Sequence, residues 1–159
     1  MTDFEFSELP EDCAPEIARL FDYWRSIHPD AGLPGRRHFD PVDIPRLLPN
    51  IWLLDVYRQP LRFRVRLSGM AINEFTGLDR TGEWCDELCG DREDTDALLC
   101  KSACVLHGKP LYRTRKVISN PGQTNAMAEI LHLPLASNGR DVDMLLNMTQ
   151  YLNRKFTRS

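Results

Sequence analysis

A strictly alternating stretch near the middle of the chain most constrains its fold. The segment Leu61–Leu67 places an apolar residue at every odd position and an arginine at every even position. Because successive side chains of a strand point to opposite faces, this pattern predicts a strand with one dry face and one face that is solvated or partnered. Such strands are typical of antiparallel sheets. The apolar stretch 50–57 precedes it and Gln59-Pro60 separates the two, which predicts a hairpin.

Residue spacing predicts the other elements. A helix is expected over 15–27, because Ile17, Leu20 and Trp24 recur at helical intervals and Pro15 suits a first turn. The remaining elements are expected as a proline-rich connector over 30–49 with one short turn at 42–48, a short helix at 70–75, a longer helix at 92–107, and strands at 111–118, 126–135 and 142–152.

The same spacing predicts which side chains two of these elements turn inward. The longer helix is expected to present an inward stripe made of Leu99, Cys100, Ala103, Leu106 and His107. The last strand is expected to point Val142, Met144, Leu146 and Met148 one way, and Asp143, Asn147 and Thr149 toward an outer face that Leu145 and Tyr151 make partly apolar.

The order of elements predicts an α+β fold. One five-stranded antiparallel sheet is expected to carry its helices on one face, with the amphipathic helix preceding it. A length of 159 residues with 42% hydrophobic residues fits one domain. The expected segments are an acidic N-terminal segment at 1–14, the helix and proline-rich connector at 15–49, the main domain at 50–152 and a short basic tail at 153–159.

Charge and hydropathy exclude several functional classes. The net charge of -3 gives no global attraction to nucleic acid. The acidic N-terminus lacks the pattern of a signal peptide, and no apolar run approaches the roughly 20 residues of a membrane span. Five cysteines, an odd number at uneven spacing, fit reduced thiols. We therefore expect a cytoplasmic protein.

Five stretches of sequence agree in order with one known family. They are RHFDPVDI at 37–44, LLPNIWLLDV at 47–56, FRVRLSG at 63–69, FTGLDRTG at 75–82 and LHLPL at 131–135. Together they resemble a family of small bacterial PAS-domain proteins in which the PAS domain is nearly the whole chain. The resemblance implies a PAS-like sheet and a signal-sensing or interaction module without catalytic machinery. The leading hypothesis is a bacterial signalling domain that contacts a protein partner, with a homodimer as its expected state.

A ligand-binding alternative stays open. PAS domains enclose a cavity between sheet and helices, and His107 and His132 are candidates to face it, as a heme ligand would have to. Other interpretations are a helix-terminal histidine for His107 and ordinary core positions for the methionines. No cofactor is assigned; a small apolar molecule or heme are the alternatives. The candidate pocket residues are Trp84, Cys100, Cys104, His107, Met127, His132 and Met148.

An interface is predicted from charge complementarity. Glu11, Asp12 and Glu16 lie in the region of the N-terminal helix, and the three arginines lie on one strand face. We expect the helix to dock near that face, or to pair with a second copy of itself. The interface candidates are Trp24, Arg62, Arg64, Arg66 and Tyr151.

A thiol-based sensor is a lower alternative. Cys85 and Cys89, and Cys100 and Cys104, form two pairs at i, i+4 spacing that four-thiolate metal binding or a redox switch would use. Buried cysteines are the simpler interpretation, and no metal site is predicted. The sequence holds no phosphate-binding glycine loop, nucleophile elbow or zinc-protease histidine pair, so no enzyme is predicted.

Overall fold

The computed structural model describes residues 8–88, 92–118 and 125–152. The predicted basic tail and Cys89 therefore lie outside the described residues. The elements are α1 (Pro15–Ser26), the single turns η1 (Arg36–His38), η2 (Pro41–Asp43) and η3 (Leu48–Asn50), β1 (Ile51–Tyr57), β2 (Arg62–Ser68), α2 (Met70–Thr76), α3 (Cys85–Leu88), α4 (Arg92–His107), β3 (Leu111–Ile118), β4 (Asn125–Leu135) and β5 (Met144–Leu152).

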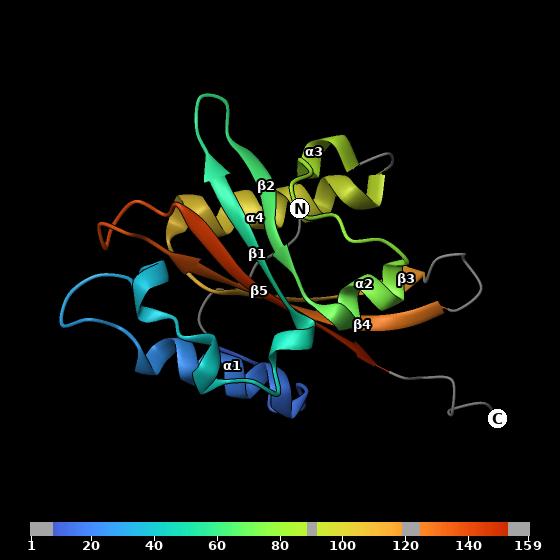
Figure 1. Cartoon of the computed structure of the whole chain (residues 1–159), viewed down its shortest axis with the longest axis horizontal. Helices are drawn as coiled ribbons and strands as arrows, with labels where there is room; N and C mark the ends of the chain where they lie inside the picture. The colour runs from blue at the N-terminus through green and yellow to red at the C-terminus, as the bar shows by residue number, and fades with distance from the viewer. Residues whose placement is uncertain (1–7, 89–91, 119–124, 153–159) are drawn as a thin grey trace.

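The five strands form one antiparallel sheet in the order β2-β1-β5-β4-β3 (Figure 1). The predicted α+β fold is confirmed. The connector differs from its prediction in containing three single turns instead of one, which suits a chain interrupted by prolines. The last strand begins at Met144, two residues later than expected.

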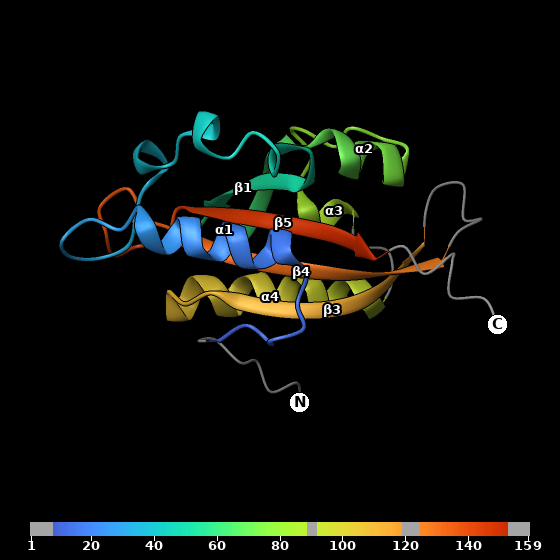
Figure 2. The same ribbon diagram turned by 90° about the horizontal axis from the view of Figure 1, so that it is seen from below.

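Helices cover both faces of the sheet. Helix α1 packs on β4 and β5, and Figure 2 shows it running alongside these strands. A second apolar cluster on the other face joins α4, through Cys104 and Val105, to Leu54 and Phe63 of the first two strands. The helices α2, α3 and α4 therefore share one face, as expected of the fold, and the N-terminal helix occupies the opposite one.

Helix α1 is held by apolar burial and by its N-terminus. Ile17 and Leu20 have no exposed surface, and side chains of this size each contribute about 1.5–3 kcal/mol when fully buried. The Trp24 indole N–H donates to the carbonyl of Pro134 at 3.0 Å. Both carboxylate oxygens of the buried Glu129 accept from the backbone N–H that precedes the helix, at 3.1 and 3.0 Å. A carboxylate at this end is also favoured by the helix dipole.

Strand pairing corrects the predicted faces of β5. Met144, Leu146 and Met148 point toward α1, and Met148 has no exposed surface. Leu145 lies in the cluster beneath α4. The alternate positions of β5, from Leu145 to Tyr151, therefore face α2–α4. The face predicted to be outer is the inner one, because helices cover both sides of this sheet.

The predicted inward stripe of α4 is wrong at three of its five positions. Leu99 is 54% exposed, Leu106 is 76% exposed, and His107 is also exposed. The inward residues of α4 include Cys100 and Cys104, with Ala97, Lys101 and Val105 also buried. The buried face of α4 includes a lysine, so apolar spacing alone does not predict which residues of this helix face inward.

The arginines of β2 hold the segment around α3 against the sheet edge. Arg62 donates to both carboxylate oxygens of Asp86 at 2.9 and 3.0 Å, and its guanidinium lies 4.0 Å from the centre of a Trp84 ring. Arg64 donates to the carbonyl of Gly82 at 2.8 Å. Helix α1 lies over β4 and β5 instead, so the prediction that the N-terminal helix docks near these arginines in the same chain is wrong.

No helix in the described ranges has both the length and the apolar character that a membrane span requires.

Candidate functional site

A pocket of about 380 Å³ lies between the inner face of the sheet and the helices α2, α3 and α4. This size falls in the range of small-molecule sites. The sheet supplies the floor, including Trp52, Ile130 and Thr149, and the helices supply Ile72 and Ala97. The lining residues come from all five strands and from the three helices α2, α3 and α4, so the pocket is a product of the whole fold.

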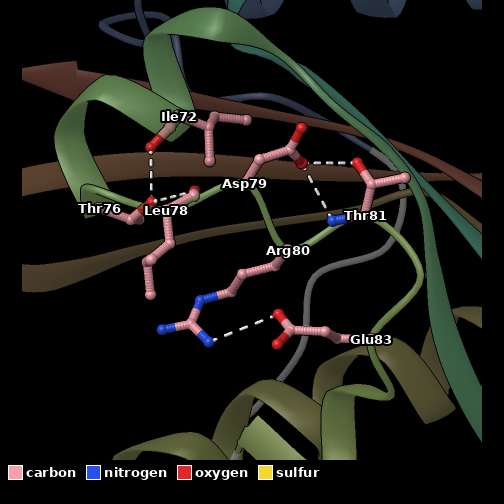
Figure 3. Close-up of polar contacts among 7 residues, drawn as sticks. All are labelled: Ile72, Thr76, Leu78, Asp79, Arg80, Thr81 and Glu83. Atoms are coloured by element: carbon pink, nitrogen blue, oxygen red, sulfur yellow. Dashed lines mark hydrogen bonds and ion pairs between the residues drawn. The ribbon is translucent and has the colours of Figure 1, made fainter.

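The segment between α2 and α3 forms one wall of the pocket, and its own polar contacts hold it in place (Figure 3). The Thr76 hydroxyl donates to the carbonyls of Ile72 and Leu78 at 2.9 and 3.1 Å. Asp79 accepts from the backbone N–H and hydroxyl of Thr81 at 3.0 and 2.6 Å. These hydrogen bonds lower the pKa of Asp79 and favour one shape of the turn.

The described side chains that line the pocket carry positive charge and no carboxylate. Five are cationic: Arg80, Lys101, Arg113, Arg115 and Lys116. At the edge of the pocket, the Arg80 guanidinium forms an ion pair with the Glu83 carboxylate at 3.7 Å. Lys101 is only 7% exposed. A charged group so far from water is costly, so its place here marks the pocket as a candidate site.

A buried chain of hydrogen bonds supports the floor of the pocket. Arg113 Nε donates to His132 Nε2 at 3.2 Å, and His132 Nδ1 donates to Asn147 Oδ1 at 2.7 Å. The Asn147 amide donates to the carbonyls of Trp52 and Leu145, each at 3.2 Å. Every polar group of the histidine ring is therefore satisfied.

His132 is neutral in this arrangement. Complete burial lowers its pKa well below the ordinary value, and the positive charge of Arg113 adds to this effect. The two hydrogen bonds are consistent, because an acceptor at Nε2 and a donor at Nδ1 describe one neutral tautomer. Burial likewise lowers the pKa of Arg113 to about 10, which leaves the guanidinium charged near neutral pH.

Aromatic rings line two sides of the pocket. The Trp52 indole N–H donates to the Thr149 hydroxyl at 2.9 Å, and the Lys101 ammonium lies 5.4 Å from the centre of a Trp52 ring. Phe75 and Tyr151 stack with ring centres 4.0 Å apart. Burial raises the pKa of Tyr151 to about 12, so its hydroxyl is protonated. The pocket thus joins flat apolar surfaces to cations.

The structure separates the predicted pocket residues. His132 lies on the pocket side of the sheet beneath the lining, and Cys100 and Cys104 are buried on the inner side of α4. Met127 and Met148 belong to the strand faces that point toward α1. Trp84 lies beneath Arg62 at the β2 edge. His107 is exposed. Met127, Met148, Trp84 and His107 are therefore not part of this pocket.

Two predicted interface residues also have internal roles. Trp24 is 5% exposed and packs on its own sheet. Tyr151 lines the pocket. The arginines of β2 lie at the sheet edge, where Arg66 is 3.6 Å from Asp55.

Sequence reasoning missed Trp52, Lys101, Arg113 and Arg115. Alternation along 111–118 places Arg113 and Arg115 on one strand face, a signal present in the sequence. Nothing in the sequence showed that this face meets α4 and its Lys101.

The cysteines behave as core residues where the structure describes them. Burial raises the pKa of Cys100 and, further, that of Cys104, which keeps both thiols protonated. The Cys104 thiol lies 3.8 Å from the carbonyl of His132. Among the described residues, no group of three or more His, Cys, Asp or Glu side chains has the arrangement of a metal site.

Solved structures with a similar fold include LOV proteins. The LOV protein of Rhodobacter sphaeroides has a TM-score of 0.55 at 15% identity, over 88% of this chain and 70% of that one. A LOV domain from a study with a flavin analogue has a TM-score of 0.55 at 14% identity, over 72% and 85% of the two chains. A fungal LOV photoreceptor domain has a TM-score of 0.51 at 13% identity, over 87% and 92%. At these identities the likeness is one of fold.

Sequence comparison assigns the family more directly. A search of the curated proteins gave no match. The family model of the PAS domain matches residues 14–149, which include α1, the connector and all three helices beneath the sheet. The chain belongs to the PAS domain family.

Proposed function

We propose that this protein is a sensory, non-enzymatic PAS domain of a bacterial signalling pathway, which binds a small organic molecule in the pocket and passes its occupancy to a protein partner. The observation that carries the proposal is the pocket itself. About 380 Å³ of space remains between the sheet and α2–α4, and buried polar groups converge on one side of it. Such pockets are the usual binding sites of small domains.

Occupancy can reach the surface through α4. Ala97 and Lys101 line the pocket, whereas Leu99 and Leu106 of the same helix are exposed. A ligand that displaces α4 therefore changes an apolar surface as well as the pocket. This arrangement supports signalling through a partner that contacts the surface of α4, in the cytoplasm as the sequence suggests.

The pocket residues do not fit a heme. His132 engages both ring nitrogens with Arg113 and Asn147, so an iron ligand would cost it at least one of these hydrogen bonds. His107 is exposed. A flavin is the ligand class suggested by the LOV study described above, and the absorption spectrum of the purified protein tests for it.

Binding in the pocket is tested with the neutral fluorescent probe N-phenylnaphthylamine and two matched variants on α4. Ala97→Leu adds volume to a residue that lines the pocket, whereas Ala103→Leu makes the same change at a half-exposed position outside the lining. We expect Ala97→Leu to weaken probe binding at least tenfold and Ala103→Leu to leave it unchanged. Equal affinities in all three folded proteins would overturn the proposal.

The homodimer remains a prediction, but the apolar face of α1 is not available as its interface. Ile17, Leu20 and Trp24 are buried against the sheet of their own chain. A dimer would have to use another surface, and Leu99 and Leu106 of α4 are exposed candidates. Sedimentation velocity of the wild type and of Leu99→Glu with Leu106→Glu tests this. A dimer that the paired substitution dissociates supports an α4 interface; a monomeric wild type rejects the homodimer.

A further inference from the structure

We propose that residues 78–81 form a flap that gates the pocket, turning about Gly77 and Gly82 to let a small molecule enter and leave. The inference rests on the proposed function, since a gate has a role only if the pocket binds a ligand. It follows from three observations, which are where the pocket meets solvent, how the chain is fixed on either side of the flap, and which contacts hold the flap between these points.

The flap lies where the pocket meets solvent. Leu78 lines the pocket although it is 51% exposed, and Arg80 lines it with a side chain that is 39% exposed. Lys116 of β3 also lines the pocket and is exposed. Residues that belong to both surfaces mark the boundary between pocket and solvent. Because a small-molecule pocket encloses most of the surface of its ligand, this boundary has to open for a ligand to exchange.

The chain is fixed on either side of the flap, and a glycine stands at each end. Gly77 ends α2 with a φ of +81°, and its N–H donates to the carbonyl of Asn73 at 2.8 Å. Gly82 has a φ of +90° and is paired with the edge of β2, where its N–H donates to the Val65 carbonyl at 2.7 Å. Glycine adopts a wide range of backbone angles, which is the property that a hinge position requires.

The polar contacts of the flap are local (Figure 3). Each hydrogen bond and ion pair described for the flap has its partner within 76–83. The Asp79 carboxylate accepts from the N–H and hydroxyl of Thr81, which maintains the shape of the flap itself. The Arg80 guanidinium pairs with the Glu83 carboxylate at 3.7 Å, and both side chains are partly exposed. Since exposed ion pairs are weak, this pair is a latch that opens easily.

The test measures by stopped-flow fluorescence how fast N-phenylnaphthylamine enters and leaves the pocket of the full chain. Glu83→Gln removes the charge that holds Arg80, and Glu83→Lys replaces it with a repelling charge. Glu83 is outside the described lining, and its carbonyl keeps the hydrogen bond from the Val65 N–H in both variants. Asp141→Asn is the matched control, because it removes the charge of a similar ion pair, with Arg140 at 3.6 Å, in the turn between β4 and β5. Circular dichroism and thermal unfolding establish that each variant is folded.

A gate changes the association and dissociation rate constants by the same factor, because it sets how often the pocket is open and leaves the bound contacts as they are. We expect Glu83→Gln to raise both rate constants about twofold to fivefold, as the loss of an exposed ion pair allows, and to leave Kd within about twofold of the wild type. Glu83→Lys should raise both rate constants further, and Asp141→Asn should change neither.

Wild-type rate constants in both Glu83 variants would overturn the inference while the ligand pocket stands. A change in Kd that comes from one rate constant alone would also overturn it, because Glu83 would then act on the bound state and not on a gate. Failure of the probe to bind these folded proteins would instead overturn the proposed function.

Discussion

The guanidinium of Arg113 donates to Nε2 of His132 at 3.2 Å, and this contact joins the charged wall of the pocket to the core of the sheet. The Nδ1 of His132 donates in turn to Oδ1 of Asn147 on the neighbouring strand, at 2.7 Å. The pocket is thus supported by a buried ring whose only compatible protonation state is neutral.

The neutral state of His132 predicts acid sensitivity. Its folded pKa lies well below the unfolded value near 6.5, so the unfolded chain takes up a proton first as the pH falls. The resulting stability is fully present above about pH 6.5 and is lost as the pH falls from there toward the folded pKa, by up to about 1.4 kcal/mol per pH unit.

Chemical denaturation between about pH 7.5 and about pH 5.5 measures this loss. His132→Gln should flatten the pH dependence in that window, at a cost in stability at neutral pH. His107→Gln, at an exposed position, should leave the dependence as in the wild type. A wild-type free energy of unfolding that does not change over this window would contradict a buried neutral histidine.

Glu129 predicts the stability of the N-terminal helix on the sheet. Its carboxylate accepts from the Ala14 N–H and from the Tyr112 hydroxyl, the latter at 2.6 Å. Glu129→Ala leaves both donors without this partner and should cost about 1–3 kcal/mol. Hydrogen exchange in α1 should accelerate accordingly. Asp22→Ala, on the exposed side of α1, is the control; similar exchange in both variants would show that Glu129 does not hold the helix.

Gly69 predicts a steric limit at the start of α2, which forms part of the pocket wall. A Cβ at this position would lie 2.3 Å from the Pro49 carbonyl oxygen and 2.6 Å from that of Leu48. Gly69→Ala should therefore lower the free energy of unfolding by more than about 2 kcal/mol. Gly82→Ala meets no atom within 4 Å and should cost only the strain of its φ of +90°, about 1 kcal/mol. Equal losses in denaturant unfolding would contradict this contact.

The buried cysteines predict slow thiol chemistry. Cys100 and Cys104 have raised pKa values because of burial, so a thiol reagent should modify them in the native protein far more slowly than in denaturant. Serine at both positions should reduce stability without changing metal content, as measured by elemental analysis. Loss of a stoichiometric metal in that variant would favour the thiol-based sensor instead.

The sequence predicted the strands well because their signals are local. Alternation at 61–67 and the turn residues around it suffice to predict β2 and its hairpin with β1. The same local spacing predicted the order of the helices and strands along the chain, and the structure has that order. Both depend on residues close together in the chain.

The faces were harder to predict, because they depend on which helix covers which side. Met148 and Tyr151 of β5 both carry apolar surface. Met148 faces α1, whereas Tyr151 faces the pocket. The alternating sequence of β2 led to the prediction that its three arginines form an interface. Arg113 and Arg115 of β3 also share one strand face, but no role was predicted for them. Only the tertiary placement of α4, with Lys101 opposite them, makes the second pair part of a site.

The tryptophan side chains allow the most direct test of the ligand pocket. The chain has three tryptophans: Trp52 lines the pocket, Trp24 of α1 packs on the opposite face of the sheet, and Trp84 lies at the β2 edge. Their indole N–H signals can be assigned by single Trp→Phe variants and followed by nuclear magnetic resonance during titration with anilinonaphthalene sulfonate. The account predicts that the Trp52 signal shifts with saturation at one probe per chain, while those of Trp24 and Trp84 stay in place. A Trp52 signal that does not move when the probe is bound would contradict it.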